Sequence, residues 1–242
     1  MRDYQKEFYD RVTFIRLLLA RSGMSGIVYG NSGGKDSALV GILCKAACEN
    51  TVGVIMPCGS KRNYETDAED AKTVAEQYHI ESRTVDLTPV RDAAIAQLAP
   101  AAPLNTQALT NLAPRLRMMT VYAVAAAEKR LVAGTGNRSE AYVGYFTKWG
   151  DGACDFNPIA DLTVTEIYEF LRFLKAPARI IEKAPSAGLF DGQTDEDEMG
   201  FTYKMLDACL MGQEVPPDVK ERIDRMHRRS EHKRAAITVF QK

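Results

Sequence analysis

The feature that most constrains this chain is a short apolar run that leads into a glycine-rich turn and then a helical pattern. Residues 26–29 read Gly-Ile-Val-Tyr, and residues 30–37 read Gly-Asn-Ser-Gly-Gly-Lys-Asp-Ser. Adjacent glycines let the backbone turn tightly and bring its N–H groups close to an anion. The helix that follows directs its positive end at the same place. We therefore predict a strand, a phosphate-binding turn and a helix, with Asp36 placed to hold a magnesium ion. A glycine turn capped by serine, without ligand, is the alternative.

The turn does not match the common phosphate loop G-x-x-x-x-G-K-[ST], because Tyr29 replaces its first glycine and Asp36 replaces its hydroxyl residue. It resembles instead S-G-G-x-D-S, the pyrophosphate loop of enzymes that split ATP into AMP and pyrophosphate. A carboxylate in place of a hydroxyl suits a metal ion held on the pyrophosphate part.

Strand-like and helical patterns alternate over the first half of the chain. We expect strands at 26–29, 51–56, 82–85 and 131–133, and helices at 2–21, 35–49, 65–78, 88–98 and 113–129. This alternation predicts an α/β fold, a doubly wound parallel sheet flanked by helices. Ligands of such sheets bind at the carboxyl ends of the strands, where both glycine turns, 30–37 and 134–136, are expected.

The last hundred residues read as loops and helices. We expect loops at 144–158 and 183–194, helices at 163–174 and 195–210, and a charged C-terminal helix. The loop 183–194 is either an ordinary surface loop or a mobile cover over a nucleotide. The acids Asp195–Glu198 are either a metal cluster or the first turn of a helix capped by Thr194. Without a linker or repeat, residues 1–242 are expected to form a single domain.

Composition excludes several classes of protein. The chain has 242 residues, 45% of them hydrophobic, and a net charge of −1, so no overall field selects nucleic acid or membrane. No apolar stretch is long enough to span a bilayer, and the charged N-terminus lacks a signal-peptide core, so we expect a cytoplasmic protein. Five scattered cysteines without a Cys-x-x-Cys pair argue against disulfides and zinc. Cys44 and Cys48, spaced i, i+4, are read as small buried side chains rather than metal ligands.

Several further segments carry a family resemblance together with the first turn. These segments are 134–140 (Gly-Thr-Gly-Asn-Arg-Ser-Glu), 144–152 (Gly-Tyr-Phe-Thr-Lys-Trp-Gly-Asp-Gly), 155–159, 185–189 and 193–196. Together they resemble the ammonia-dependent NAD synthetase family over nearly the whole chain. The pyrophosphate loop alone is shared with GMP synthetase, asparagine synthetase and sulfur-transfer relatives. The segment 144–155 is far more specific.

The resemblance implies a fold, a reaction and partners. The fold would be adenine-nucleotide α-hydrolase-like, a Rossmann-like sheet, without a glutaminase domain. ATP would adenylate the carboxylate of nicotinic acid adenine dinucleotide (deamido-NAD) and release pyrophosphate. Ammonia would then attack the acyl-adenylate, giving NAD and AMP. Family members are homodimers with the dinucleotide site at the interface, so a homodimer is expected here, with no nucleic acid or membrane partner.

The resemblance also implies residue roles. Residues expected to bind ATP are Gly30, Asn31, Ser32, Gly33, Gly34, Lys35, Asp36, Ser37, Thr135 and Ser186. Residues expected to bind the dinucleotide are Arg115, Lys148, Asp155, His232 and Lys233. The metal ligands for Mg²⁺ would be Asp36 and Glu140, two hard carboxylates beside phosphate oxygens. Expected catalytic residues are Lys35, Asp36 and Asp151, the last either ordering its loop or shaping the ammonia site.

One position departs from the family. Many members carry a lysine for the ATP phosphates two residues after an Asp-Leu pair, and this chain has Val164 there. We expect Lys35 to supply the missing cation. Trp149 is either a core aromatic or a neighbour of the nicotinate ring. Two rival functions stay open: another ATP-pyrophosphatase with a different acceptor, and a nucleotide-binding sensor without turnover.

Overall fold

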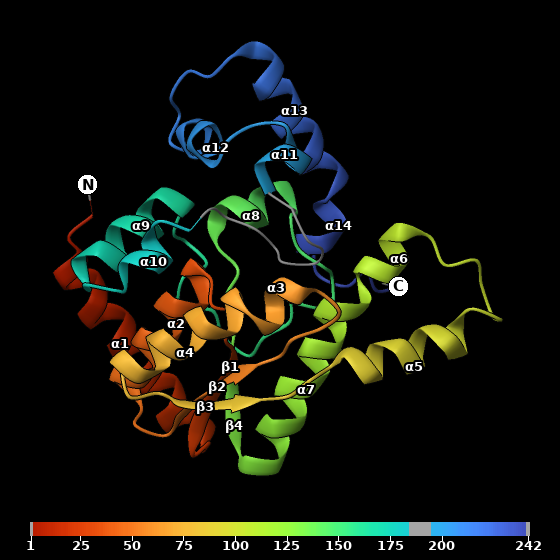
Figure 1. Cartoon of the computed structure of the whole chain (residues 1–242). Helices are drawn as coiled ribbons and strands as arrows, with labels where there is room; N and C mark the ends of the chain where they lie inside the picture. Colours follow the sequence, from red (N-terminus) through yellow and green to blue (C-terminus); the bar gives the residue numbers. More distant parts are fainter. Residues whose placement is uncertain (1, 184–194, 241–242) are drawn as a thin grey trace.

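A parallel sheet of four strands in the order β3-β2-β1-β4 lies at the centre of the computed structural model, which describes residues 2–183 and 195–240 (Figure 1). The strands are β1 (Gly26–Gly30), β2 (Thr51–Ile55), β3 (Glu81–Thr84) and β4 (Arg130–Ala133). Ile27 lies opposite Thr51 on one side and Leu131 on the other. The chain thus extends the sheet from β1 in both directions, and the topological switch point falls between β1 and β4. All four predicted strands are confirmed.

Different helices cover the two faces of the sheet. One face carries α1 (Tyr4–Ser22), α2 (Lys35–Ala47), α4 (Thr66–Gln77) and α9 (Val164–Phe173), and the other carries α7 (Leu112–Glu128). Ile27 and Tyr29 belong to the core under the first group, whereas Val28 packs against Val121 and Ala125 of α7. Alternate residues of β1 therefore serve opposite cores. The predicted doubly wound α/β fold is confirmed.

The remaining helices are shorter or lie outside these two layers. They are α3 (Lys61–Tyr64), α5 (Thr88–Leu98), α6 (Thr106–Thr110), α8 (Arg138–Val143), α10 (Ala178–Ile181), α11 (Asp195–Met199), α12 (Tyr203–Leu210), α13 (Pro217–Arg229) and α14 (Glu231–Arg234). The helix predicted at 88–98 is confirmed as α5. Within the described residues, none of the helices has the length and apolarity needed to cross a bilayer. All five cysteines are free, Cys44 being buried and Cys48 half-buried.

The C-terminal helices form a separate core beside α8 (Figure 1). Val143 of α8, Met199 of α11, Leu206 of α12 and Ile223 of α13 are buried in it. The single helix predicted over 195–210 is wrong, because α11 ends before Gly200, whose φ of +73° is left-handed. The Thr202 side chain then caps α12 by accepting from the backbone N–H of Met205. A glycine at the end of one helix and a threonine at the start of the next divide the segment.

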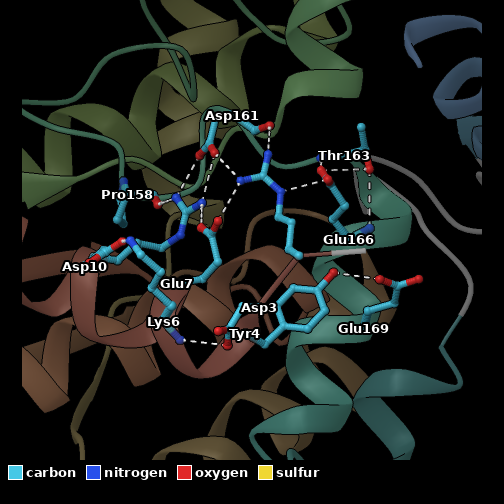
Figure 2. Close-up of polar contacts among 12 residues, drawn as sticks. Asp3, Tyr4, Lys6, Glu7, Asp10, Pro158, Asp161, Thr163, Glu166 and Glu169 are labelled. Carbon is cyan, nitrogen blue, oxygen red and sulfur yellow. Dashed lines mark hydrogen bonds and ion pairs between the residues drawn. The ribbon is translucent and has the colours of Figure 1, made fainter. Parts of the chain in front are cut away.

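A network of charged side chains ties α1 to the segment that leads into α9 (Figure 2). The Arg2 guanidinium donates to Glu166 at 2.7 Å and to Asp161 at 2.9 Å. Arg11 donates to Asp161 at 2.7 Å and also to the backbone carbonyl of Pro158. The first turn of α9 is further fixed by a capping box in which Glu166 accepts from its N-cap residue. This network holds the polypeptide that packs behind the second glycine turn.

Candidate active site

A cavity of about 790 Å³ opens at the carboxyl ends of β1, β2 and β4. Gly30 at the end of β1, Met56 after β2 and Gly134 after β4 all line it. Helix N-termini and glycine turns meet there, as parallel sheets arrange them at a switch point. The prediction that both glycine turns share one sheet edge is confirmed by this cavity.

The first glycine turn is shaped by close backbone approaches. Gly33 has a φ of +70°, and a Cβ built there would lie 2.2 Å from the backbone oxygen of Asp67 in α4. The Asn31 amide spans the same gap by donating to the carbonyl of Ala71 at 3.1 Å. Gly34 is the N-cap of α2 and has no side-chain cap. The α2 N-terminus therefore faces the cavity with backbone N–H groups, the arrangement that favours an anion.

Lys35 lies between two acids of the cavity wall. Its Nζ lies 2.8 Å from Asp36 Oδ2 and 3.8 Å from Glu140 Oε1, and its side chain is only 6% exposed. Burial alone would lower the pKa of Lys35, but the charges of Asp36 and Glu140 raise it above its usual range. For Glu140, burial and then the like charge of Asp36 raise the pKa to about 8, with Lys35 opposing the rise.

The second glycine turn places Glu140 opposite the first. Asn137 caps α8, and Glu140 completes the capping box by accepting from the backbone N–H of Asn137. The Asn137 side chain donates to Asp36 Oδ1 at 3.0 Å, which joins the two turns directly. Behind the turn, Asn157 donates to the carbonyl of Gly136 at 2.8 Å. The capping requirement of one short helix thus brings two distant carboxylates together.

The residues predicted for the dinucleotide divide into two groups. Only Lys233 lines the cavity, and its Nζ donates to the carbonyls of Gly144 and Phe146. Arg115, Lys148 and His232 do not line it but lie in one chain of contacts. Arg115 donates to the Lys148 carbonyl at 3.4 Å, and the Lys148 ammonium donates to the His232 carbonyl at 2.6 Å.

Asp155 is hydrogen-bonded to strand β4 of the sheet. It also lies outside the cavity lining, and its carboxylate accepts from the backbone N–H of Val132 at 2.8 Å and from the Tyr122 hydroxyl at 3.1 Å. Thr135, predicted for ATP, lines the cavity. Ser186, together with the segment 184–194 and its Thr194, lies outside the described residues.

Asp151 orders the loop in which it lies. Its Oδ1 accepts from the backbone N–H of Thr147 at 2.8 Å. Asp151 is exposed on the side of the cavity, and desolvation by the protein atoms near its carboxylate raises its pKa. The neighbouring Trp149 is 55% exposed, which excludes the first of its two alternatives, a core aromatic; a place beside the nicotinate ring stays a prediction.

Sequence reasoning missed two cations of the cavity wall. Arg117 of α7 donates to the Met56 carbonyl at 3.2 Å, and burial lowers its pKa. Lys183 donates to the Gly33 carbonyl at 3.2 Å and to Asp67 and Asp70 at 2.7 and 2.6 Å. Lys183 begins the loop predicted at 183–194, and the sequence signal for its role is its place two residues before Pro185 in a family segment.

Val164 packs in the C-terminal core, and Asp195, the first acid of α11, is hydrogen-bonded to a neighbouring tyrosine. The Val164 side chain is buried in the C-terminal core, and its backbone N–H donates to Ser139 Oγ at 3.2 Å. A valine there supplies no positive charge, and Lys35 and Lys183 are cations that line the cavity instead.

Asp195 lies at the start of α11 and accepts from the Tyr203 hydroxyl at 3.0 Å. Among residues 2–183 and 195–240, no three His, Cys, Asp or Glu side chains form a metal-binding group.

These features define a class of protein: an α/β fold whose parallel sheet carries, at its switch point, a cavity lined by two glycine turns and paired carboxylates, an arrangement suited to an anionic ligand. Comparison with known proteins narrows the class. A model of the family described as NAD synthase matches residues 7–236. The chain belongs to the NAD synthase family, and it is accordingly an ATP-using ligase that forms C–N bonds.

The relatives cover nearly the whole chain. An NH(3)-dependent NAD(+) synthetase from Carboxydothermus hydrogenoformans is 46% identical over 96% of this chain and 96% of its own length. One from Pyrococcus horikoshii is 41% identical over 96% of this chain and 93% of its own.

Two solved structures share the fold over their full lengths. An NMN synthetase from Francisella tularensis has a TM-score of 0.94 at 37% identity, covering 100% of both chains. An NH3-dependent NAD synthetase from Campylobacter jejuni has a TM-score of 0.83 at 30% identity, again covering 100% of both.

Proposed function

We propose that this chain catalyses the ATP-dependent amidation of nicotinic acid adenine dinucleotide with ammonia, giving NAD, AMP and pyrophosphate. One observation carries the proposal: the turns after β1 and β4 face a single cavity, with Lys35, Asp36 and Glu140 between them. The names of relatives that match the chain at 41–46% identity support the same substrates.

The chemistry requires an activated carboxylate, because a carboxylate oxygen is a poor leaving group. A substrate carboxylate oxygen attacks the α-phosphorus of ATP, the bond to the bridging oxygen breaks, and pyrophosphate leaves. The ammonia nitrogen then attacks the acyl carbon and loses a proton, while the C–O bond to AMP breaks. No protein nucleophile takes part, so catalysis is positioning and charge neutralisation.

The protein's residues divide these tasks. The first turn and the N-terminus of α2 bind the phosphates through backbone N–H groups. Lys35 and Lys183, both in the cavity wall, neutralise phosphate charge in place of the lysine that Val164 replaces. Asp151 keeps the 144–151 loop ordered through Thr147 N–H, and Lys233 ties the same loop to the C-terminal helices.

A magnesium ion fits the carboxylates Asp36 and Glu140. Both are hard oxygen donors, their side chains are 17% and 18% exposed, and both approach the same ammonium group. Two carboxylates are too few ligands by themselves, so phosphate oxygens and water would complete the six that Mg²⁺ requires. The ion would neutralise charge that develops on the departing pyrophosphate.

Amidation of the corresponding mononucleotide is the second candidate. The structure titled NMN synthetase superimposes with a TM-score of 0.94. In addition, Arg115, Lys148, Asp155 and His232, which the resemblance assigns to the dinucleotide, do not line the cavity. A smaller substrate needs none of them, whereas the dinucleotide would use them in an enzyme that dimerises over this surface.

Three further expectations complete the proposal. The synthetase unit is one domain over residues 1–242 and takes free ammonia as donor. A homodimer places a second copy against the surface of Arg115 and Lys148. Cytoplasmic location stays a prediction.

The decisive assay supplies ATP, Mg²⁺ and ammonium with either nicotinic acid adenine dinucleotide or nicotinic acid mononucleotide. We expect one AMP for each amide formed and a higher kcat/KM for the dinucleotide. A higher kcat/KM for the mononucleotide would favour the second candidate. Release of ADP, or nucleotide binding without turnover, would refute both and favour a different ATPase or a sensor.

A further inference from the structure

The acids proposed to hold magnesium each use their two oxygens in the same way. Asp36 Oδ1 accepts from the Asn137 side chain at 3.0 Å, and Glu140 Oε2 accepts from the Asn137 backbone N–H at 3.5 Å. The other two oxygens, Asp36 Oδ2 and Glu140 Oε1, lie 2.8 and 3.8 Å from Lys35 Nζ. Asn137 therefore fixes one side of the pair, and Lys35 holds the other.

The ammonium of Lys35 is itself firmly placed. Its side chain is 6% exposed, and Nζ lies 5.5 Å from the centroid of the Tyr203 ring, which adds a cation–π contact. Lys35 is the first residue of α2, directly after the two glycines of the first turn. Lys35 and the backbone of the first turn line the same cavity, so an anion bound at the turn would lie in the same site as the ammonium.

We propose that Lys35 is a tethered counter-ion that competes with the divalent cation for Asp36 Oδ2 and Glu140 Oε1. A metal ion held by the two carboxylates would take the oxygens that Asn137 leaves open, so it would compete with the Lys35 ammonium for them. The cation binds well only when ATP phosphates receive the displaced ammonium. Metal and nucleotide therefore bind cooperatively, and this chain restrains its two acids without any metal. The inference rests on the proposed metal-binding role of this site.

The test is direct binding of Mn²⁺ to the nucleotide-free protein by calorimetry and electron paramagnetic resonance. The variant is Lys35→Met, with Lys35→Gln as a second variant that keeps a hydrogen-bonding group. We expect both to bind Mn²⁺ at least about tenfold more tightly than the unaltered protein, a usual size for coupling between ligands. We also expect the difference to disappear in an Asp36→Asn background.

Two matched controls separate competition from a general change in charge. Lys233→Met removes another cation of the cavity wall whose Nζ contacts carbonyls, not carboxylates. Lys45→Met makes the same change on α2 at a lysine paired with Glu49. Equal Mn²⁺ affinity in the Lys35 variants and the unaltered protein would overturn the proposal, as would an equal gain in Lys233→Met. Because no substrate is turned over, this result is independent of whether NAD is formed.

Discussion

The close contact between the first glycine turn and the backbone of α4 can be tested by adding a single methyl group at Gly33. Gly33→Ala adds a Cβ at a residue with φ of +70°, 2.2 Å from the Asp67 carbonyl oxygen and 3.0 Å from the Ala71 nitrogen. The obstructing atoms belong to the backbone of α4, so no side-chain rotation relieves the contact. The left-handed backbone costs about 1–2 kcal/mol and the forced packing about 1–3 kcal/mol, so we expect a loss of about 2–5 kcal/mol.

Gly34→Ala is the matched control. Gly34 has φ of −95° and ψ of 169°, a conformation open to alanine, and its added Cβ would lie 3.3 Å from the movable Ser32 Oγ. The reduced entropy of the unfolded chain offsets this contact, and the net change should stay within about 1 kcal/mol.

The assay is urea unfolding followed by circular dichroism, with and without ATP and Mg²⁺. We expect Gly33→Ala to lower the midpoint strongly and to lose the stabilisation that ATP gives. Stability of Gly33→Ala within about 0.5 kcal/mol of the unaltered protein would refute the reasoning, since that is the range of substitutions that touch nothing.

Two further predictions concern stability. The pKa of Glu140 is raised from 4.5 to about 8, so its contribution to stability is complete below pH 4.5 and is lost as the pH rises through 8. Glu140→Gln should therefore flatten the fall in the free energy of unfolding between pH 5 and 9, measured by denaturation at each pH. An unchanged slope would contradict this prediction. Arg11→Leu should lower the free energy of unfolding by about 2 kcal/mol, because its guanidinium, 11% exposed, holds Asp161 and the Pro158 carbonyl. Lys6→Leu is the control, because its pair with Asp10, also drawn in Figure 2, is more than half exposed and should contribute less than about 1 kcal/mol. Equal losses in the two variants would contradict the larger contribution expected from Arg11.

The elements with strong local signals were predictable. The β1 strand is a short apolar run, and the alternation of its side chains between two cores is a property of any strand buried on both faces. The glycines at 33 and 34 predict the turn, because few other residues adopt the left-handed backbone that it requires at Gly33. The helix predicted at 195–210 failed at Gly200, where a left-handed residue breaks a pattern that is otherwise helical on both sides.

The sequence alone determined the parallel sheet, the two glycine turns and the family, since these depend on neighbouring residues and on motifs read in order. Tertiary structure alone decided that Lys35 lies between Asp36 and Glu140, acids that are 104 positions apart, and that Arg117 and Lys183 reach the same cavity. It also placed Asp155 against the sheet and Val164 in a separate core. The direction of a side chain depends on what packs around its element, and a motif records only which residues follow one another.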